Sequence, residues 1–262
     1  MRIQVMKLKA ILATVIFAGA ILSAPTIACA AAPASSQGAT ASAVQSRLSK
    51  KQFRNIKVTV DDNVATLTGT VELFQYKADA QKTASHTQGI KAVRNQIEVK
   101  GENVTDAELQ KKLLGKLTYD RVNEGNVFDA ISVSVRNGVV TLGGHAHNYV
   151  NRNSAIALVS NTPGVKEMVN NIQVDPTSMM DDQTRLALAR AIYGFTTLNK
   201  YALDPAKPIR ISVQNGNVEL YGVVDSKADK DEAFMRANGV AGVFSVKNYL
   251  QVAGQLTEQQ PD

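Results

Sequence analysis

The sequence predicts an α+β protein built from three tandem copies of one small αββαβ domain, each a three-stranded sheet with two helices on one face. Three observations predict it. A twelve-residue block recurs three times, beginning at Val58, Val133 and Ile211. Each block has the pattern of two period-two strands around a two-residue turn. A glycine closes each block, and in every copy a second glycine follows twenty residues later, after a helical pattern.

The two-residue turns lie at Asp62-Asn63, Asn137-Gly138 and Asn215-Gly216. Asn-Gly is a strong hairpin signal, because a type I′ turn needs positive φ at both central residues. The Asp62-Asn63 turn is a weaker version of the same chemistry. In the second strand of each hairpin, apolar residues two apart share one face, and these are Ala65 with Leu67, Val140 with Leu142, and Val218 with Leu220.

Each hairpin is followed by a helical pattern with small residues four apart, which lets a helix sit close to a sheet. The pairs are Ala80 with Ala84, Ala155 with Val159, and Ala233 with Ala237. We expect the glycine after each helix to occupy the C′ position and a third strand to follow it; the glycines are Gly89, Gly164 and Gly242. A helix should also precede each hairpin. Thr105 with Glu108 predicts a capping box, and Ser178 a weaker cap.

The N-terminus has the pattern of a secretory signal peptide. Arg2, Lys7 and Lys9 precede a 14-residue apolar run, and Ala28-Cys29-Ala30 is a small-x-small cleavage pattern. The run is shorter than the ~20 apolar residues that span a bilayer. We therefore expect cleavage after Ala30 and a periplasmic protein. A lipoprotein acylated at Cys29 is the weaker alternative, because Thr26 stands where a Leu-like residue is expected.

We expect the chain to divide into a signal peptide over residues 1–30, a flexible linker over 31–42, copies over 43–100, 105–175 and 181–253, and a flexible tail over 254–262. Without residues 1–30 the chain keeps 26 Lys and Arg against 23 Asp and Glu. This charge is too small to suggest nucleic-acid binding.

The repeated pattern resembles the BON domain, a family named after bacterial osmotically inducible and nodulation proteins. In the second copy, the pattern is carried by Val133, Val135, Gly138, Val140, Leu142, Gly144, Ala155, Gly164, Val165, Asn170, Ile172 and Val174. Asn63 departs from it where a turn glycine is usual, as does Met168 where a valine is usual. The resemblance implies association with phospholipid at the cell envelope, sometimes under osmotic stress, and no catalysis.

The residues themselves suggest no catalytic site, metal site or cofactor. His145 and His147 lie two apart, but two imidazoles without further ligands do not make a zinc site, so we interpret them as exposed histidines at a strand end. Asn95, Asn170 and Asn248 recur in the third strands with their side chains expected to face the helices. A buried amide must be hydrogen-bonded, so we interpret this column as structural, tying a loop to the strand.

The charge differs between the copies. Residues 41–101 hold ten Lys and Arg against five Asp and Glu, whereas the other two copies are nearly balanced. The excess cations are Lys50, Lys51, Arg54 and Lys57, with Lys77 and Lys82 on the second helix. They form either a solvated rim or a patch for anionic phospholipid, where each cation contributes about 1 kcal/mol. In the third copy Tyr221 and Tyr249 occupy outward strand positions, which predicts either a contact between domains or a ligand platform.

The sequence thus predicts an exported, non-enzymatic envelope protein that binds phospholipid or another envelope surface, in osmotic or envelope stress. The alternative is a periplasmic scaffold or chaperone-like factor that binds envelope proteins through exposed sheet faces and strand edges.

Overall fold

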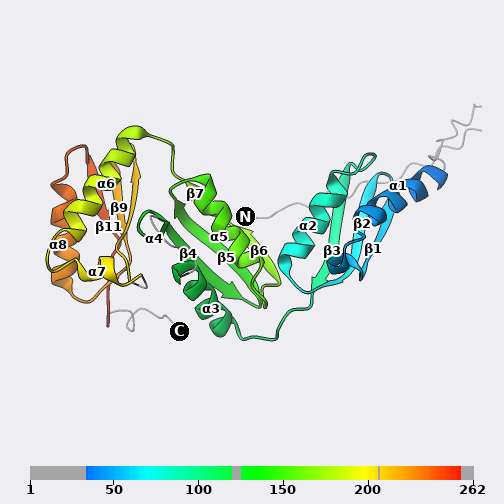
Figure 1. Ribbon diagram of the computed structural model, residues 1–262, viewed down its shortest axis with the longest axis horizontal. Helices are drawn as coiled ribbons and strands as arrows, with labels where there is room; N and C mark the ends of the chain where they lie inside the picture. Colours follow the sequence, from blue (N-terminus) through cyan, green and yellow to red (C-terminus); the bar gives the residue numbers. More distant parts are fainter. Residues whose placement is uncertain (1–33, 120–124, 206, 255–262) are drawn as a thin grey trace, which may run out of the picture.

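A computed structural model describes residues 34–119, 125–205 and 207–254. The expected signal peptide, Cys29 and residues 255–262 of the expected tail lie outside this part of the chain. Figure 1 shows three similar helix-and-sheet units following one another along the chain. Within the described residues, no helix combines the length and the apolar character needed to cross a membrane.

Each unit follows the predicted αββαβ order, with short helical turns added. Copy one contains α1 (Ala34–Arg47), the 3-10 turn η1 (Lys51–Phe53), β1 (Ile56–Asp61), β2 (Val64–Val71), α2 (Phe74–Ser85) and β3 (Ala92–Val99). Copy two contains α3 (Asp106–Tyr119), α4 (Gly125–Phe128), β4 (Ala130–Arg136), β5 (Val139–Ala146), α5 (Tyr149–Ser160), β6 (Glu167–Asn170) and β7 (Gln173–Val174). Copy three contains α6 (Met179–Tyr193), α7 (Lys200–Leu203), β8 (Arg210–Gln214), β9 (Asn217–Tyr221), β10 (Val223–Val224), α8 (Lys227–Asn238), β11 (Ser245–Asn248) and β12 (Gln251–Val252).

The second strand of each hairpin is the centre of its sheet. In copy one β2 pairs antiparallel with β1 and parallel with β3. Copies two and three repeat this order, but their third strand is divided into two short pieces, β6 and β7 or β11 and β12. The predicted fold class is therefore confirmed, with a more irregular third strand than the sequence predicts.

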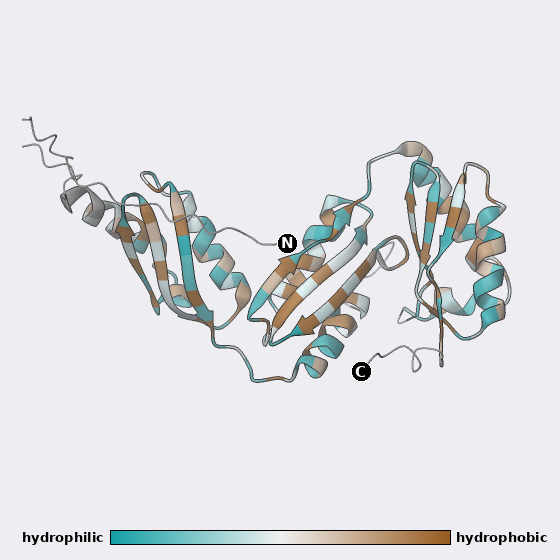
Figure 2. Ribbon diagram, turned by 180° about the vertical axis from the view of Figure 1, so that it is seen from behind, coloured by the Kyte–Doolittle hydropathy of each residue, from teal (hydrophilic) through white to brown (hydrophobic). Residues whose placement is uncertain are grey.

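One apolar core lies between the sheet and the helices of each copy. Apolar and polar residues alternate along the strands (Figure 2), as a sheet with one buried face requires. The small residues of the second helix are fully buried, as the stripe predicts: Ala80, Ala84, Ala155, Val159, Ala233 and Ala237. The close approach of these helices to the sheets is therefore encoded in the sequence.

The three hairpin turns have the predicted geometry. Both central residues have positive φ in every copy, including Asp62 at 45° and Asn63 at 65°. These are the φ signs of a type I′ turn. The weaker dipeptide of copy one thus adopts the conformation that Asn-Gly adopts in the other copies, and the Asn63 side chain supports it by donating to the carbonyl of Gly89.

The glycines after the second helices do not occupy the C′ position, so that prediction is wrong. α5 ends at Ser160, whereas Gly164, with φ 99°, is the third residue of a separate turn. The Val165 amide closes this turn by donating to the carbonyl of Thr162. Positive φ at the third position is the requirement of a type II turn, and Pro163 suits the second position. Gly89 and Gly242 lie in equivalent turns.

The expected flexible linker over residues 31–42 is also wrong in part, because α1 begins at Ala34. The segment is rich in alanine, the best helix former. Val44 and Leu48 at the end of this stretch are buried in the core of copy one. Burial of these two side chains holds the segment against the sheet, and the preceding residues continue the helix. The predicted caps of α3 and α6 are confirmed, with Thr105 and Glu108 bonded reciprocally and Ser178 accepting from the Asp181 amide.

The asparagine column is structural, as the sequence predicts, but it holds a helix and not a loop. The Asn248 side chain donates to the Lys230 carbonyl of α8 and accepts from the Leu250 amide. Asn95 makes the equivalent bonds to the Lys77 carbonyl of α2 and the Ile97 amide. In copies one and three the amide therefore ties the crossover helix to the third strand, whereas Asn170 of copy two accepts a bond from the Ile172 amide within the strand region.

Candidate functional site

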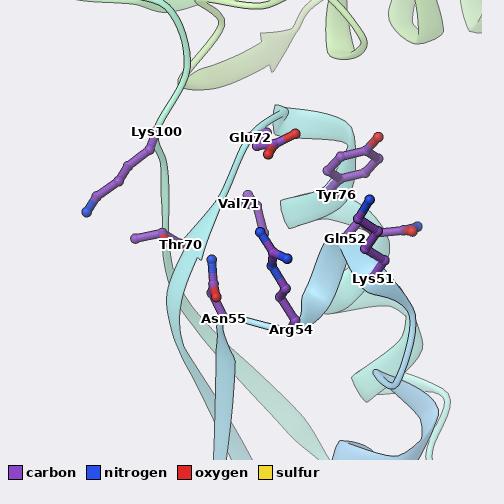
Figure 3. A pocket seen from close by; sticks show the side chains of 9 residues that line it. All are labelled: Lys51, Gln52, Arg54, Asn55, Thr70, Val71, Glu72, Tyr76 and Lys100. Carbon is purple, nitrogen blue, oxygen red and sulfur yellow. The ribbon is translucent and has the colours of Figure 1, made fainter.

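A polar pocket of about 400 Å³ lies at one end of copy one. Figure 3 shows side chains from η1, the start of β1, the end of β2, the first turn of α2 and the end of β3 around it. The lining residues are Lys51, Gln52, Arg54, Asn55, Thr70, Val71, Glu72, Tyr76 and Lys100.

The pairing of β2 with β3 brings together pocket residues that are far apart in the sequence. Val71 of β2 lies opposite Val99 of β3 in the parallel pairing, and the Lys100 amide donates to the Val71 carbonyl. Lys100 and Glu72 therefore leave the sheet side by side. On the other side Phe53 is buried and anchors η1 to the core.

The pocket carries three cations and one carboxylate that do not neutralise one another. Lys51, Arg54, Lys100 and Glu72 are exposed. None of the four forms an ion pair with another residue in the part of the chain that the structure describes. Figure 3 shows the Arg54 guanidinium extending into the middle of the ring of side chains, below Glu72. The charged groups remain available to a ligand.

The structure brings together some of the six predicted cations and separates others. Lys51 and Arg54 line the pocket. Lys50 precedes η1, and Lys57 lies in β1 two residues after Asn55, so both are close to lining residues in the chain but do not line the pocket. Lys82 lies in the last turn of α2, away from the first turn that contributes Tyr76.

Lys77 has a different role from the predicted one. Its ammonium forms an ion pair with Glu167 of β6 in copy two, and its side chain is only 14% exposed. This lysine therefore joins copies one and two. The sequence reasoning missed the other lining residues, which are Gln52, Asn55, Thr70, Val71, Glu72, Tyr76 and Lys100. No local motif marks these residues; the parallel pairing of β2 with β3 places Glu72 beside Lys100.

A second polar cluster lies buried at the junction of copies two and three. Arg185 of α6 is 1% exposed, and its guanidinium donates to Asp175, Asp182 and the Val213 carbonyl. Asp175 directly follows β7 and also accepts bonds from Ser212 and Gln214 of β8. We call Asp175, Asp182, Arg185, Ser212 and Gln214 the junction cluster. It connects the end of copy two to the first helix and first strand of copy three.

The two histidines belong to this junction, so their interpretation as exposed residues is wrong. His145 Nδ1 lies 3.0 Å from the Gln214 amide nitrogen and 3.4 Å from an Asp175 oxygen. His147 Nε2 lies 3.0 Å from Asp182 of α6. Both side chains are about one fifth exposed, at 18% and 22%. Because copy three packs on the end of β5, the histidines contact it directly. Among the described residues no group of three or more His, Cys, Asp or Glu is arranged to hold a metal ion.

Tyr221 and Tyr249 contact each other. Their rings stack with centroids 5.1 Å apart and an angle of 18° between planes. The Tyr221 hydroxyl donates to Glu219. Burial of the hydroxyl raises the pKa of Tyr221 above its usual value, and the negative charge of Glu219 raises it further. Tyr249 remains 49% exposed. The two rings therefore contact each other within copy three, and the expected contact between domains or ligand platform stays a prediction.

The sequence pattern of one family, the BON domain, matches residues 36–101, 105–176 and 195–254. The chain belongs to the BON-domain family. The three matches correspond to the three structural copies, although the third begins after α6, so each copy is a BON domain. We number the BON domains one to three in chain order.

The chain is also similar to individual proteins. It is 26% identical over 188 residues to "Osmotically-inducible protein Y" of Escherichia coli (strain K12), covering 67% of this chain and 86% of that protein. Two solved structures of CdsD, a structural protein of the type III secretion system of Chlamydia trachomatis, match at 18% and 17% identity. They cover 84% and 80% of this chain and 98% and 96% of theirs. Each has a TM-score of 0.24.

Proposed function

We propose that this protein is an exported, non-enzymatic envelope protein that docks on anionic phospholipid through BON domain one and acts in osmotic or envelope stress. The BON family and the similarity to an osmotically inducible protein support the general class. The cations without ion-pair partners at the pocket of domain one are the observation that supports binding to anionic phospholipid. Cations near an anionic membrane surface each contribute about 1 kcal/mol.

The docking set differs from the one that the sequence predicts. It consists of Lys50, Lys51, Arg54 and Lys57, which make no ion pair with a described residue, together with Lys100. Lys77 is excluded because Glu167 already pairs with it. Lys82 is excluded because it lies at the other end of α2.

Vesicle flotation tests this proposal. Replacement of Lys50, Lys51, Arg54 and Lys57 by glutamine should weaken binding to anionic vesicles at low salt by up to about 4 kcal/mol. A matched control replaces four exposed cations of the other domains that also lack an ion pair with any described residue, namely Lys111, Arg136, Lys166 and Arg190. Equal losses from both sets would mean diffuse electrostatic attraction and would contradict a site in domain one.

A second candidate function is a protein-interaction scaffold. Large apolar side chains that remain in solvent favour it, and the most exposed are Met179 at 83%, Phe244 at 82% and Leu203 at 78%. Rising salt separates the two candidates, because it weakens docking on charged lipid and leaves apolar contacts in place. Binding of an envelope protein that is unchanged by salt, together with no flotation on any anionic vesicle, would replace the lipid proposal.

Export is tested by the intact mass of the purified protein. A mature N-terminus at Ala31 is expected when residues 1–30 are removed as a signal peptide. A diacylglyceryl adduct on Cys29 would instead show a membrane-anchored lipoprotein.

A further inference from the structure

We infer that the pocket of BON domain one recognises a phosphate ester that also carries an ammonium group, the chemistry of an aminophospholipid headgroup. The inference deepens the proposed function and rests on it for the membrane source of the ligand. It follows from the presence of a carboxylate and a tyrosine ring among the pocket cations.

One side of the pocket suits the phosphate. The Arg54 guanidinium extends into its middle and the Asn55 side chain lies beside it, whereas the Lys51 side chain rises from η1 on the side of Tyr76 (Figure 3). A guanidinium presents a planar fork of N–H donors that fits two phosphate oxygens at once, and an ammonium adds a point charge. Arg54 and Lys51 are exposed and make no ion pair with a described residue, so neither must leave a protein partner to bind a phosphate.

The other side suits an ammonium group. Glu72 follows β2 and Tyr76 lies in the first turn of α2, and Figure 3 shows both on the same side of the pocket. A carboxylate attracts an amine directly, and an aromatic ring attracts a cation through its negative face. Glu72 is not paired with Lys51, Arg54 or Lys100 at 4.0 Å or less. A pocket for a simple anion gains nothing from this free carboxylate, because like charges repel.

The volume of the pocket and its exposure to solvent both suit a lipid headgroup. The volume of about 400 Å³ lies within the usual range of small-molecule pockets. Its charged residues are exposed, so a group presented at a membrane surface can reach them. Lys50 and Lys57 are exposed and lie close to lining residues in the chain, and they would face neighbouring anionic lipids while one headgroup occupies the pocket.

The test uses two soluble phosphodiester probes, glycerophosphoethanolamine, which carries the amine, and glycerophosphoglycerol, which lacks it. Chemical-shift titration of the purified protein should show binding of the first at resonances of the pocket residues. Glu72→Gln should weaken this binding by about threefold to fivefold, the effect of one exposed charge pair. The same variant should leave glycerophosphoglycerol binding unchanged or stronger, because a repulsive charge is removed.

Two further variants complete the design. Arg54→Gln should weaken binding of both probes, since it contacts the phosphate that they share. Glu98→Gln is the matched control, because Glu98 is an exposed glutamate of β3 that does not line the pocket. It should change neither affinity. All three changes are at exposed side chains, and thermal unfolding checks that the fold is unchanged.

The inference is overturned if neither probe binds, or if Glu72→Gln and Glu98→Gln have the same effect. Binding to anionic vesicles with no such dependence on Glu72 would leave the proposed function standing and remove this inference. The opposite result, a Glu72-dependent preference for glycerophosphoethanolamine without vesicle binding, would support the pocket assignment and show that the ligand is a soluble ester.

Discussion

The guanidinium of Arg185 and the carboxylate of Asp175 form an ion pair, 3.0 Å apart, at the junction of BON domains two and three. Arg185 belongs to the first helix of domain three, and Asp175 follows the last strand of domain two. Both side chains are almost fully buried, at 2% and 0% exposure. The pair therefore ties two domains that a short surface linker would leave independent.

Loss of the arginine should destabilise the junction strongly. Arg185→Met leaves the Asp175 carboxylate in the interior without its guanidinium partner, which costs about 3–5 kcal/mol, whereas Asp175→Asn should cost less, because Arg185 keeps its ion pair with Asp182. The double variant Asp175→Leu with Arg185→Met should recover part of this loss, because no buried charge remains. Urea unfolding of the whole protein measures these changes.

The exposed pair Lys227 and Asp231 provides the control, with side chains 78% and 54% exposed. Lys227→Gln should change the free energy of unfolding by less than about 0.5 kcal/mol. A comparable effect at both pairs would mean that the junction cluster is not a buried unit.

Asp229 should make domain three sensitive to acid. Burial by itself raises the pKa of this carboxyl, but hydrogen bonds from Lys200 and Tyr201 outweigh burial and hold the pKa below its usual value. A carboxyl whose pKa is lower in the folded state stabilises the protein above the unfolded pKa, and this contribution disappears as pH falls through the folded pKa.

The stability difference between the natural protein and Asp229→Asn should therefore shrink as pH falls below the usual aspartate pKa of about 3.9. Urea unfolding at neutral and acid pH measures it. Asp231→Asn in the same helix is the control and should show a smaller change with pH, because Asp231 is exposed. A difference for Asp229→Asn that is independent of pH would contradict the assignment.

Replacement of two glycines of domain two by alanine should change the stability of the protein in opposite directions. A Cβ at Gly144, whose φ is 85°, would lie 1.9 Å from the Ala130 carbonyl oxygen, whereas one at Gly115 in α3 would meet nothing within 4 Å. Gly115→Ala should stabilise the protein by about 0.5–1 kcal/mol. Gly144→Ala should destabilise it by more than about 1 kcal/mol. Thermal unfolding shifts of the same sign would contradict this.

Asn248→Ala should show the energetic role of the asparagine column. It leaves the Lys230 carbonyl and the Leu250 amide without their side-chain partner. The cost of unsatisfied groups of this kind is about 1–3 kcal/mol. Asn171→Ala in domain two is the control, because its exposed side chain makes no hydrogen bond to a described residue. Denaturant unfolding should show little change for the control.

The sequence predicted the hairpins, the buried helix stripes and the caps because each depends on residues within one short segment. The residue types of Asn137-Gly138 favour the positive φ angles that the turn needs, and Ala155 with Val159 marks the buried face of a helix. The misplaced C′ glycines show the limit of this reasoning. Gly164 needs positive φ in either setting, so its residue type did not distinguish a helix end from a separate turn.

The sequence by itself determined three αββαβ domains, their hairpin register and the basic character of the first. Only the tertiary structure decided which charges act together. Lys77 pairs with Glu167 ninety residues away, and Gln214 lies against His145 sixty-nine residues away. Such pairs depend on how whole domains and strand ends pack, and neither period-two nor helical patterning carries that information. For the same reason Glu72 and Lys100 meet at the pocket through the pairing of β2 with β3, although neither residue belongs to a local motif.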